Sequence, residues 1–376
     1  LLLVPFATLQ TISIEDTEDH VVTYNTQLTS SGTLKIDFRI LVSDAPNEYA
    51  QVAYVTIREG FVETLRPEGE REFTLYKQNS IRGNIQLIGN SVKLDANGVQ
   101  CAANGTNNNS ITTVYADRDN DTTTFNSTSA TLKLPPDVKS DDILYAMLYW
   151  QGRTNADVNF GETERNIKIK TSNQTSYTPL RSIDSKFNWL NEDYQGITDI
   201  TDIIKTDIDD SNQTLIEING YNQNIWIADV HSPDNSNGFG AWAIAVVYED
   251  GSTLRNISTY DGYKSVHNET ITTDLTGFLT PTTGVVDSDF LVFAGEGDIT
   301  LTDNVTLTDV NDNEIALGNN IFKSSVDIDG TNVTSRNPFC QNTIGVDIRR
   351  FNVGTNANIP IIGNSQTSTT IKLVST

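Results

Sequence analysis

Short apolar or alternating runs recur about every 8–15 residues along this chain, separated by clusters of Asn, Gly, Asp and Ser. Helical periodicity is almost absent, which argues against alternating strands and helices. The pattern predicts an all-β fold with minimal helix. We expect a large β-sandwich or jelly-roll-like domain with a smaller N-terminal β-sandwich region.

Three runs illustrate the pattern. In LKIDFRILV (34–42), apolar and charged side chains alternate between the two faces of a strand. AWAIAVVY (241–248) is apolar on both faces and predicts a central strand that is covered on both sides. ITDITDIIKTDI (197–208) is the one helix candidate, with Thr198 or Asp199 as its cap.

A domain boundary is predicted between residues 80 and 81. Residues 1–80 contain an apolar strand and a small β region, whereas residues 81–376 are denser in Asn and Thr. No linker rich in Pro, Gly or Ser separates the two parts, so we expect them to pack together.

The charge balance restricts the partners. The 376 residues include 49 acidic and 25 basic side chains, which gives a formal net charge of −24. This charge repels nucleic acid and anionic lipid. No apolar run reaches the ~20 residues of a membrane helix, and LLLVPFATL at the start lacks the basic flank of a signal peptide. We expect neither nucleic-acid binding nor membrane insertion, and interpret the opening run as mature protein.

Cys101 and Cys340 are the two cysteines of the chain. A single even pair in an exported protein favours one disulfide that closes a long loop, which stabilises by roughly 3–5 kcal/mol in the chain-entropy model. Two unpaired buried thiols are the alternative.

From about residue 81 the chain resembles a module of large exported bacterial surface proteins, in which it lies upstream of Ig-like stalk repeats. The matching stretches include GNIQLIGNSV (83–92), YADRDNDTTTFNSTSATLKLP (115–135), ILYAMLYWQGR (143–153), FGAWAIAVVYEDGSTLRNISTYDGY (239–263), NVTSRNPFCQNTIGVDI (332–348) and STTIKLVST (368–376). The resemblance implies an adhesin-like surface domain without an established activity. In that family another apolar strand usually follows the equivalent of TTIKLVST, so the last strand of the module is expected to be missing here.

Asp117, Asp119 and Asp121 alternate in the segment DRDND. Carboxylates at this spacing can converge from one loop on Ca²⁺, which takes six to eight oxygen ligands. An acidic surface turn is the alternative, because the Gly and the distal Glu of an EF-hand are absent. Calcium is therefore the one cofactor considered, and no organic cofactor is expected.

Catalytic patterns are lacking. His20, His231 and His267 are isolated and fit no zinc motif. Cys101 with His231 as a nucleophilic pair has little support, and Trp150 and Trp242 lie in apolar runs where core packing is favoured. The chain is therefore not expected to be an enzyme.

The apolar opening run suggests a mechanism of assembly. Leu1, Leu2, Leu3, Val4, Phe6 and Leu9 form a strand that a soluble monomer would not leave exposed. Donation of this strand to the incomplete sandwich of the next copy would build an open filament. Pairing within its own chain is the alternative.

The leading prediction is an extracellular, cell-surface structural or adhesive protein that forms a pilus-like homopolymer by donor-strand complementation. A stalk-borne domain that binds a carbohydrate or another ligand on a host or environmental surface is the second hypothesis. An aromatic side chain exposed beside the Asp-rich loop would favour it. A secreted hydrolase ranks third.

Overall fold

The computed structural model describes residues 70–375, except 99, 155–161, 189–192, 235–237, 267 and 301. All described residues belong to one compact unit, Leu65–Thr376. About half of the structure is strand and 9% is helix, in several antiparallel sheets, which confirms the all-β class. The predicted boundary at residues 80/81 falls inside one continuous strand, Arg71–Ser91.

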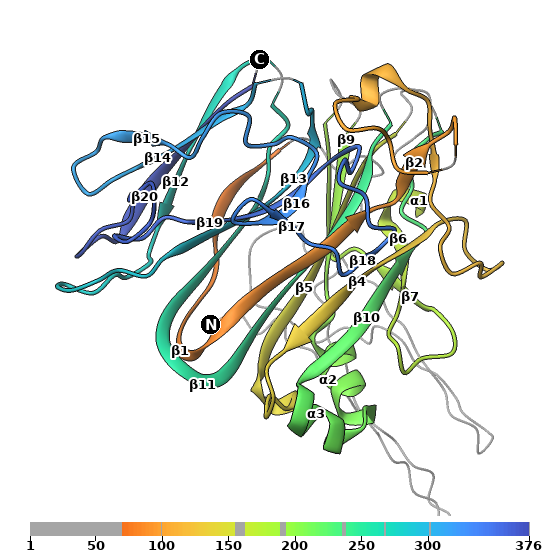
Figure 1. Cartoon of the computed structure of the whole chain (residues 1–376), viewed down its shortest axis with the longest axis horizontal. Coiled ribbons are helices and arrows are strands. Elements are labelled where there is room, and N and C mark those ends of the chain that lie inside the picture. Colours follow the sequence, from red (N-terminus) through yellow and green to blue (C-terminus); the bar gives the residue numbers. More distant parts are fainter. Residues whose placement is uncertain are drawn as a thin grey trace, which may run out of the picture. The chain divides into compact units, whose positions relative to one another are not determined.

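Two five-stranded sheets form the larger sandwich (Figure 1). The first has the order β1 (Arg71–Ser91), β11 (Gly240–Tyr263), β5 (Ile143–Arg153), β9 (Asp193–Asp199) and β8 (Asp184–Asn188). The second has the order β18 (Arg336–Asn337), β4 (Ser127–Leu134), β10 (Tyr221–Ala228), β6 (Asn166–Lys170) and β7 (Thr178–Arg181). Trp150, Trp242 and Ile225 lie in the apolar core that both sheets share. AWAIAVVY lies in β11 between β1 and β5, as its composition predicts.

The long strands β1 and β11 form a ribbon that bends near Gly83 (Figure 1). Arg82 pairs with Leu254 whereas Gly83 pairs with Glu249, so four residues of β11 bulge out at the bend. Tyr76, in the distal half of the ribbon, lies edge-on against Tyr145 of β5, at a ring-centre distance of 6.1 Å. The bent ribbon thereby covers part of the outer face of the first sheet.

Two four-stranded sheets form a smaller sandwich. One has the order β12 (Thr270–Thr276), β20 (Ser368–Val374), β14 (Asn304–Thr308) and β15 (Glu314–Ala316). The other has the order β13 (Asp289–Gly297), β19 (Gly345–Asn352), β16 (Val326–Ile328) and β17 (Thr331–Asn332), in which β16 and β19 are parallel. Val305, Leu307 and Val353 lie in the core between these sheets. Ile348 of β19 packs with Ala243 of β11, which joins the smaller sandwich to the larger one.

The remaining elements are short. They are the β2–β3 hairpin (Lys93–Asp95 and Thr113–Tyr115), the 3-10 turns η1 (Asn108–Ser110) and η2 (Ser140–Asp142), and the helices α1 (Glu162–Arg165), α2 (Thr201–Asp210) and α3 (Gln213–Asn219). The helix expected at 197–208 begins later, at Thr201, because Ile197 pairs with Tyr149 in the sheet. Ile200 occupies the N-cap position predicted for Thr198 or Asp199, but Asp199 Oδ1 accepts a 2.8 Å hydrogen bond from the amide of Thr201, the first helical residue.

Candidate functional site: the free edge of β13

Most edge strands with described side chains carry a feature that disfavours the addition of another strand. Strand β7 contains Pro179, strand β12 contains Asp274 and several threonines, and strand β1 is bent and carries cationic residues. The other three are short: β15 has three residues, and β17 and β18 have two each. Proline, charge, bends and shortness are the usual protections of a sheet edge. An edge that has none of them therefore invites pairing.

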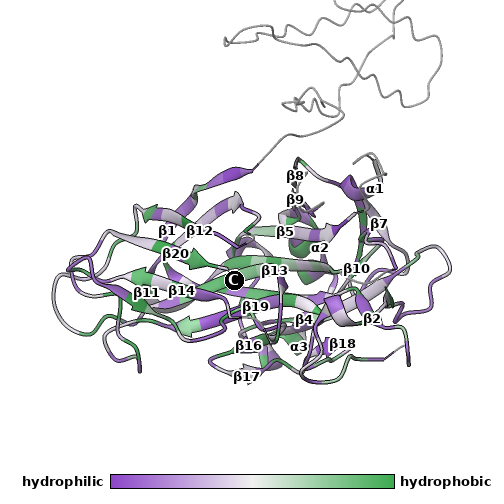
Figure 2. Ribbon diagram, turned by 90° about the horizontal axis from the view of Figure 1, so that it is seen from above, coloured by the Kyte–Doolittle hydropathy of each residue, from purple (hydrophilic) through white to green (hydrophobic). Residues whose placement is uncertain are grey.

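The middle of strand β13 is such an edge, between Asp289 at its start and the bulge with Glu296 near its end. It is hydrogen-bonded to β19 alone among the described strands. Its residues Phe290–Ala294 are consecutively apolar, with no proline and no charge, and every one of these side chains is only partly buried. Figure 2 shows β13 with its hydrophobic colouring. A long apolar edge of this kind is a template for β-augmentation.

The pairing of β19 reveals which backbone groups of β13 are free. The amide of Ile348 donates to Ser325 O, and the carbonyl of Arg350 accepts from the amide of Asp329, so both point toward the β16 side. Backbone groups alternate between the two sides of a strand. The amide and carbonyl of Arg349, which lies between Ile348 and Arg350, therefore point toward β13, where Arg349 pairs with Val292. The amides and carbonyls of Leu291 and Phe293 therefore point away from β19, along the open edge.

Both faces of β13 are apolar because alternate side chains enter different clusters. Phe290, Val292 and Ala294 pack against the core of the smaller sandwich. Phe293 points to the other face and packs in the cluster with Leu87 of β1. A strand added beside β13 would extend a sheet that already lies between two apolar layers.

The far end of β13 is fixed by charges. Arg153 of β5 forms a 3.0 Å ion pair with Asp193 and lies 3.5 Å from Glu296 of β13. Asp298, directly after the strand, is only 2% exposed. Asn109 donates to one of its carboxyl oxygens over 3.2 Å. These contacts tie the end of β13 to the larger sandwich.

The predicted assembly residues Leu1, Leu2, Leu3, Val4, Phe6 and Leu9 lie outside the described residues. The structure therefore characterises the edge that would receive a strand. The run Phe290–Ala294 has the apolar pattern of a strand, but no signal in the sequence marks it as an edge.

The three aspartates of the DRDND loop are held by side chains of the protein. The single hydroxyl of Ser127 is shared between Asp117 Oδ1 and Asp119 Oδ1, at 2.8 and 2.7 Å, and Lys170 Nζ lies 2.5 Å from Asp119 Oδ2. Burial opposes ionisation of Asp119, but the hydrogen bonds from Lys170, Ser127 and Tyr177 outweigh it and lower its pKa. A cation at Asp119 Oδ2 would have to displace the Lys170 ammonium, and calcium binding stays a prediction.

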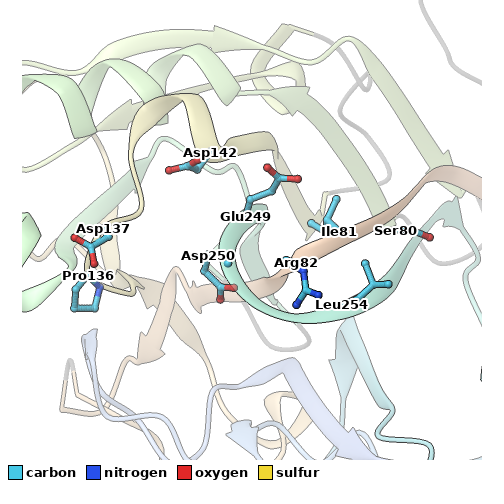
Figure 3. Close-up of a pocket in the computed structure, with 10 residues that line it drawn as sticks. Ser80, Ile81, Arg82, Pro136, Asp137, Asp142, Glu249, Asp250 and Leu254 are labelled. Atoms are coloured by element: carbon cyan, nitrogen blue, oxygen red, sulfur yellow. The ribbon is translucent and has the colours of Figure 1, made fainter.

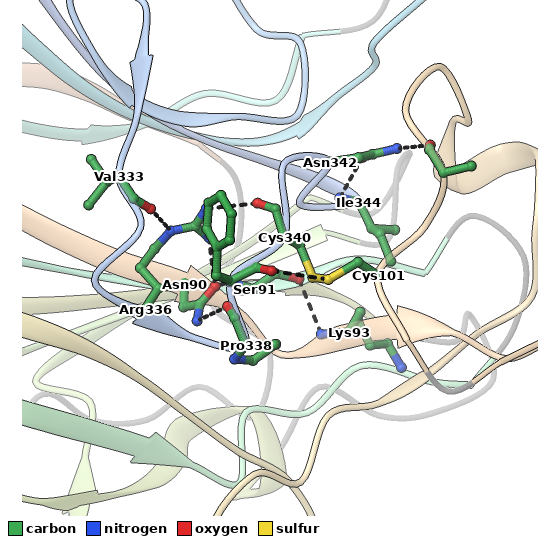
Figure 4. The surroundings of a disulfide bond; sticks show 12 residues. Asn90, Ser91, Lys93, Cys101, Val333, Arg336, Pro338, Cys340, Asn342 and Ile344 are labelled. Atoms are coloured by element: carbon green, nitrogen blue, oxygen red, sulfur yellow. Dashed lines mark hydrogen bonds between the residues drawn. A yellow bond between two sulfur atoms is a disulfide. The ribbon is translucent and has the colours of Figure 1, made fainter.

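Cys101 and Cys340 form a disulfide (Figure 4). The bond ties the loop after β2 to the segment after β18. Beside it, Arg336 donates to Asn90 Oδ1 and to the carbonyl of Cys340, at 3.0 and 2.8 Å. Asn90 also donates to the carbonyl of Pro338. The segment after β18 is therefore joined to the loop after β2 by a covalent bond and to β1 by a buried polar network.

A hollow of about 570 Å³ lies at the bend of the ribbon (Figure 3). Its lining includes Arg82 and the carboxylates Asp137, Asp142, Glu249 and Asp250. Carboxylates alone do not define a reaction, and we assign this hollow no role. Within the described ranges, no group of three or more His, Cys, Asp or Glu side chains is arranged to hold a metal. The described helices are all too short or too polar to cross a bilayer.

Comparison with known proteins adds no relative: no family model, curated protein or solved structure matches the chain. The resemblance to exported surface modules therefore stays a prediction.

Proposed function

We propose that this chain is an extracellular structural protein whose copies join by strand addition. Residues 1–9 of one copy would add as a strand to the free edge of β13 in the next. The observation that carries the proposal is the unprotected edge Phe290–Ala294, with backbone groups of Leu291 and Phe293 left unpaired by the described strands. Because donor and acceptor are different surfaces, the contact is heterologous and propagates into an open filament.

The expected strength of the joint follows from the apolar side chains involved. Leu1–Leu9 contains six large apolar side chains and no charge. Each one that becomes fully buried contributes about 1.5–3 kcal/mol. The sum is on the order of 10 kcal/mol before the cost of ordering the strand is subtracted. Such a joint holds a fibre together without a covalent bond.

The test compares the full chain with a variant that lacks residues 1–10. We expect fibres of the full chain in negative-stain electron micrographs, and dispersed particles of the variant. Leu291→Pro should also abolish fibres, because proline removes an edge amide that faces the donor and leaves the bonds to β19 in place. Leu291→Ala, which keeps that amide, is the control. Fibres that persist in the deletion variant would refute the proposal.

A second function has partial support from one observation. The aromatic residues Tyr177 and Trp226 lie beside the DRDND loop, although they are half-buried rather than exposed. Tyr177 donates to Asp119 over 2.8 Å, and Lys170 Nζ lies 4.3 Å from the Tyr177 ring centre and 5.9 Å from that of Trp226. Aromatic rings beside hydrogen-bonding carboxylates suit a sugar.

We propose this cluster as the binding surface if the chain acts as a stalk-borne carbohydrate-binding domain. A glycan array run with the wild type and Trp226→Ala tests it. Binding that the substitution removes, with unchanged thermal stability, would support the second function. An array without any bound glycan would count against it.

A further inference from the structure

We propose that the loop after β13 binds Ca²⁺ through the carboxylate of Asp298 and the side-chain oxygen of Asn320. The loop begins where β13 ends at Gly297, and Asn320 belongs to the segment between β15 and β16. This site uses none of the aspartates of the DRDND loop. It also does not depend on strand addition, so it goes beyond the proposed function.

Two buried oxygen atoms at this loop have no hydrogen-bond partner among the described residues. One is Oδ1 of Asp298, a residue that is only 2% exposed, and the other is Oδ1 of Asn320. A buried acceptor without a donor costs free energy, and a bound ion or water is a usual reason for its presence. Because both atoms are acceptors, one cation could satisfy them together.

Hydrogen bonds hold the residues of the site near one another. Asn320 Nδ2 donates to the carbonyl of Ile299, the residue directly after Asp298, over 2.9 Å. The same loop is held by Asn107, which exchanges two hydrogen bonds of 2.6 and 3.2 Å with Thr300. The loop is therefore ordered before a ligand binds, which lowers the entropic cost of binding.

The charges around Asp298 favour a cation over a water molecule. Burial, followed by the charges of Glu296 and Asp303, raises the pKa of Asp298 to about 6. Arg153 lies 3.5 Å from Glu296 and opposes this shift without cancelling it. A divalent cation would neutralise the excess of negative charge, whereas a water molecule would leave it in place.

The ligand atoms favour Ca²⁺ among the common divalent cations. Carboxylate and amide oxygens are hard ligands that suit Ca²⁺ or Mg²⁺. Mg²⁺ requires a nearly ideal octahedron and gives up its waters reluctantly, which a buried carboxylate does not suit. Only one of the two assigned ligands is charged, so backbone and water oxygens would have to complete the shell. We therefore expect a Kd of about 0.1–1 mM, the range of extracellular calcium modules.

Calorimetric titration of the full chain with CaCl₂ at pH 7.5, after removal of metal with a chelator, tests the site. Asp298→Asn keeps the size of the side chain and an acceptor for Asn109, but it removes the charge. We expect it to raise the Kd at least about 10-fold. It also removes an unfavourable charge from the metal-free protein, so a weaker fold would not explain the loss. Asp121→Asn, in the DRDND loop, is the matched control and should leave this Kd unchanged.

Asn320→Asp distinguishes a ligand from a residue that only supports the loop. If Oδ1 of Asn320 contacts the ion, a second carboxylate should lower the Kd for Ca²⁺ about 10-fold. If Asn320 only supports the loop through its bond to Ile299, the loss of the amide donor brings no gain in affinity. An Asn320→Asp variant with unchanged or weaker affinity would therefore overturn its assignment as a ligand.

The other outcomes are equally decisive. A wild type that does not bind Ca²⁺, equal affinities of the wild type and Asp298→Asn, or a loss confined to Asp121→Asn would overturn the site. Tighter binding of Mg²⁺ than of Ca²⁺ would overturn the choice of ion. Fibre formation by the variant that lacks residues 1–10 decides the proposed function separately, so the two can fail independently.

Discussion

Asn109 donates a 3.2 Å hydrogen bond to one carboxyl oxygen of Asp298, and the other oxygen of this buried carboxyl has no partner among the described residues. The bond connects the loop of η1 with the end of β13. Burial, followed by the charges of Glu296 and Asp303, raises the pKa of Asp298 to about 6, and Arg153 opposes this shift. The end of the acceptor strand is therefore sensitive to pH.

The first prediction concerns this carboxyl. Its folded pKa lies above the value of 3.8 for the free group, so the folded state binds more protons between about pH 4 and pH 6. The contribution of Asp298 to stability is therefore present at low pH and is lost as the pH rises through 6. Asp298→Asn should be more stable than the wild type at pH 7.5 by about 2 kcal/mol.

Chemical denaturation at pH 4 and pH 7.5 measures the difference. At pH 4 the two proteins should be nearly equal in stability, because Asp298 is then protonated. The exposed Asp209, changed to Asn, is the control and should shift neither value. A stability difference that is the same at both pH values would contradict the assignment.

The second prediction concerns the ion pair of Arg349 and Asp327 in the acceptor sheet. The two charges lie 2.9 Å apart, with side chains 6% and 4% exposed. Arg349→Met leaves the Asp327 charge buried without its partner, so we expect a loss of about 3–5 kcal/mol in unfolding free energy. The double variant Asp327→Leu, Arg349→Met should recover a large part of that loss. A double variant that is the sum of its singles would show that the pair is not coupled.

The sequence predicts those features that depend on local pattern. AWAIAVVY is apolar on both faces, and it lies in a central strand covered on both sides. Features that depend on distant pairing could not be predicted. Ile197 has helical spacing with Ile200 and Ile204, yet β5 draws it into the sheet. The run Phe290–Ala294 is equally compatible with a central strand, and only its neighbours make it an edge. The candidate site is therefore a property of topology.

The third prediction concerns the bend of the ribbon. A Cβ added at Gly83 would lie 2.0 Å from the backbone oxygen of Tyr248. The backbones of β1 and β11 would have to separate, so Gly83→Ala should lower the unfolding free energy by about 2–3 kcal/mol. Gly98→Ala is the control, because there the added Cβ meets the flexible end of the Gln100 side chain. Equal melting temperatures of the two variants would contradict the close approach at the bend.

The last prediction concerns the disulfide. Cys101 and Cys340 are separated by 239 residues, so the bond removes much of the conformational freedom of the unfolded chain. Replacement of both cysteines by alanine should lower the unfolding free energy by about 3–5 kcal/mol. The wild type in reducing agent should show the same loss, whereas the double alanine variant should not respond to reducing agent. Asn342 donates to the carbonyls of Ala103 and Thr106 and holds the same segments without the disulfide, so the variant should still fold. A variant as stable as the oxidised wild type would mean that these hydrogen bonds alone fix the two segments.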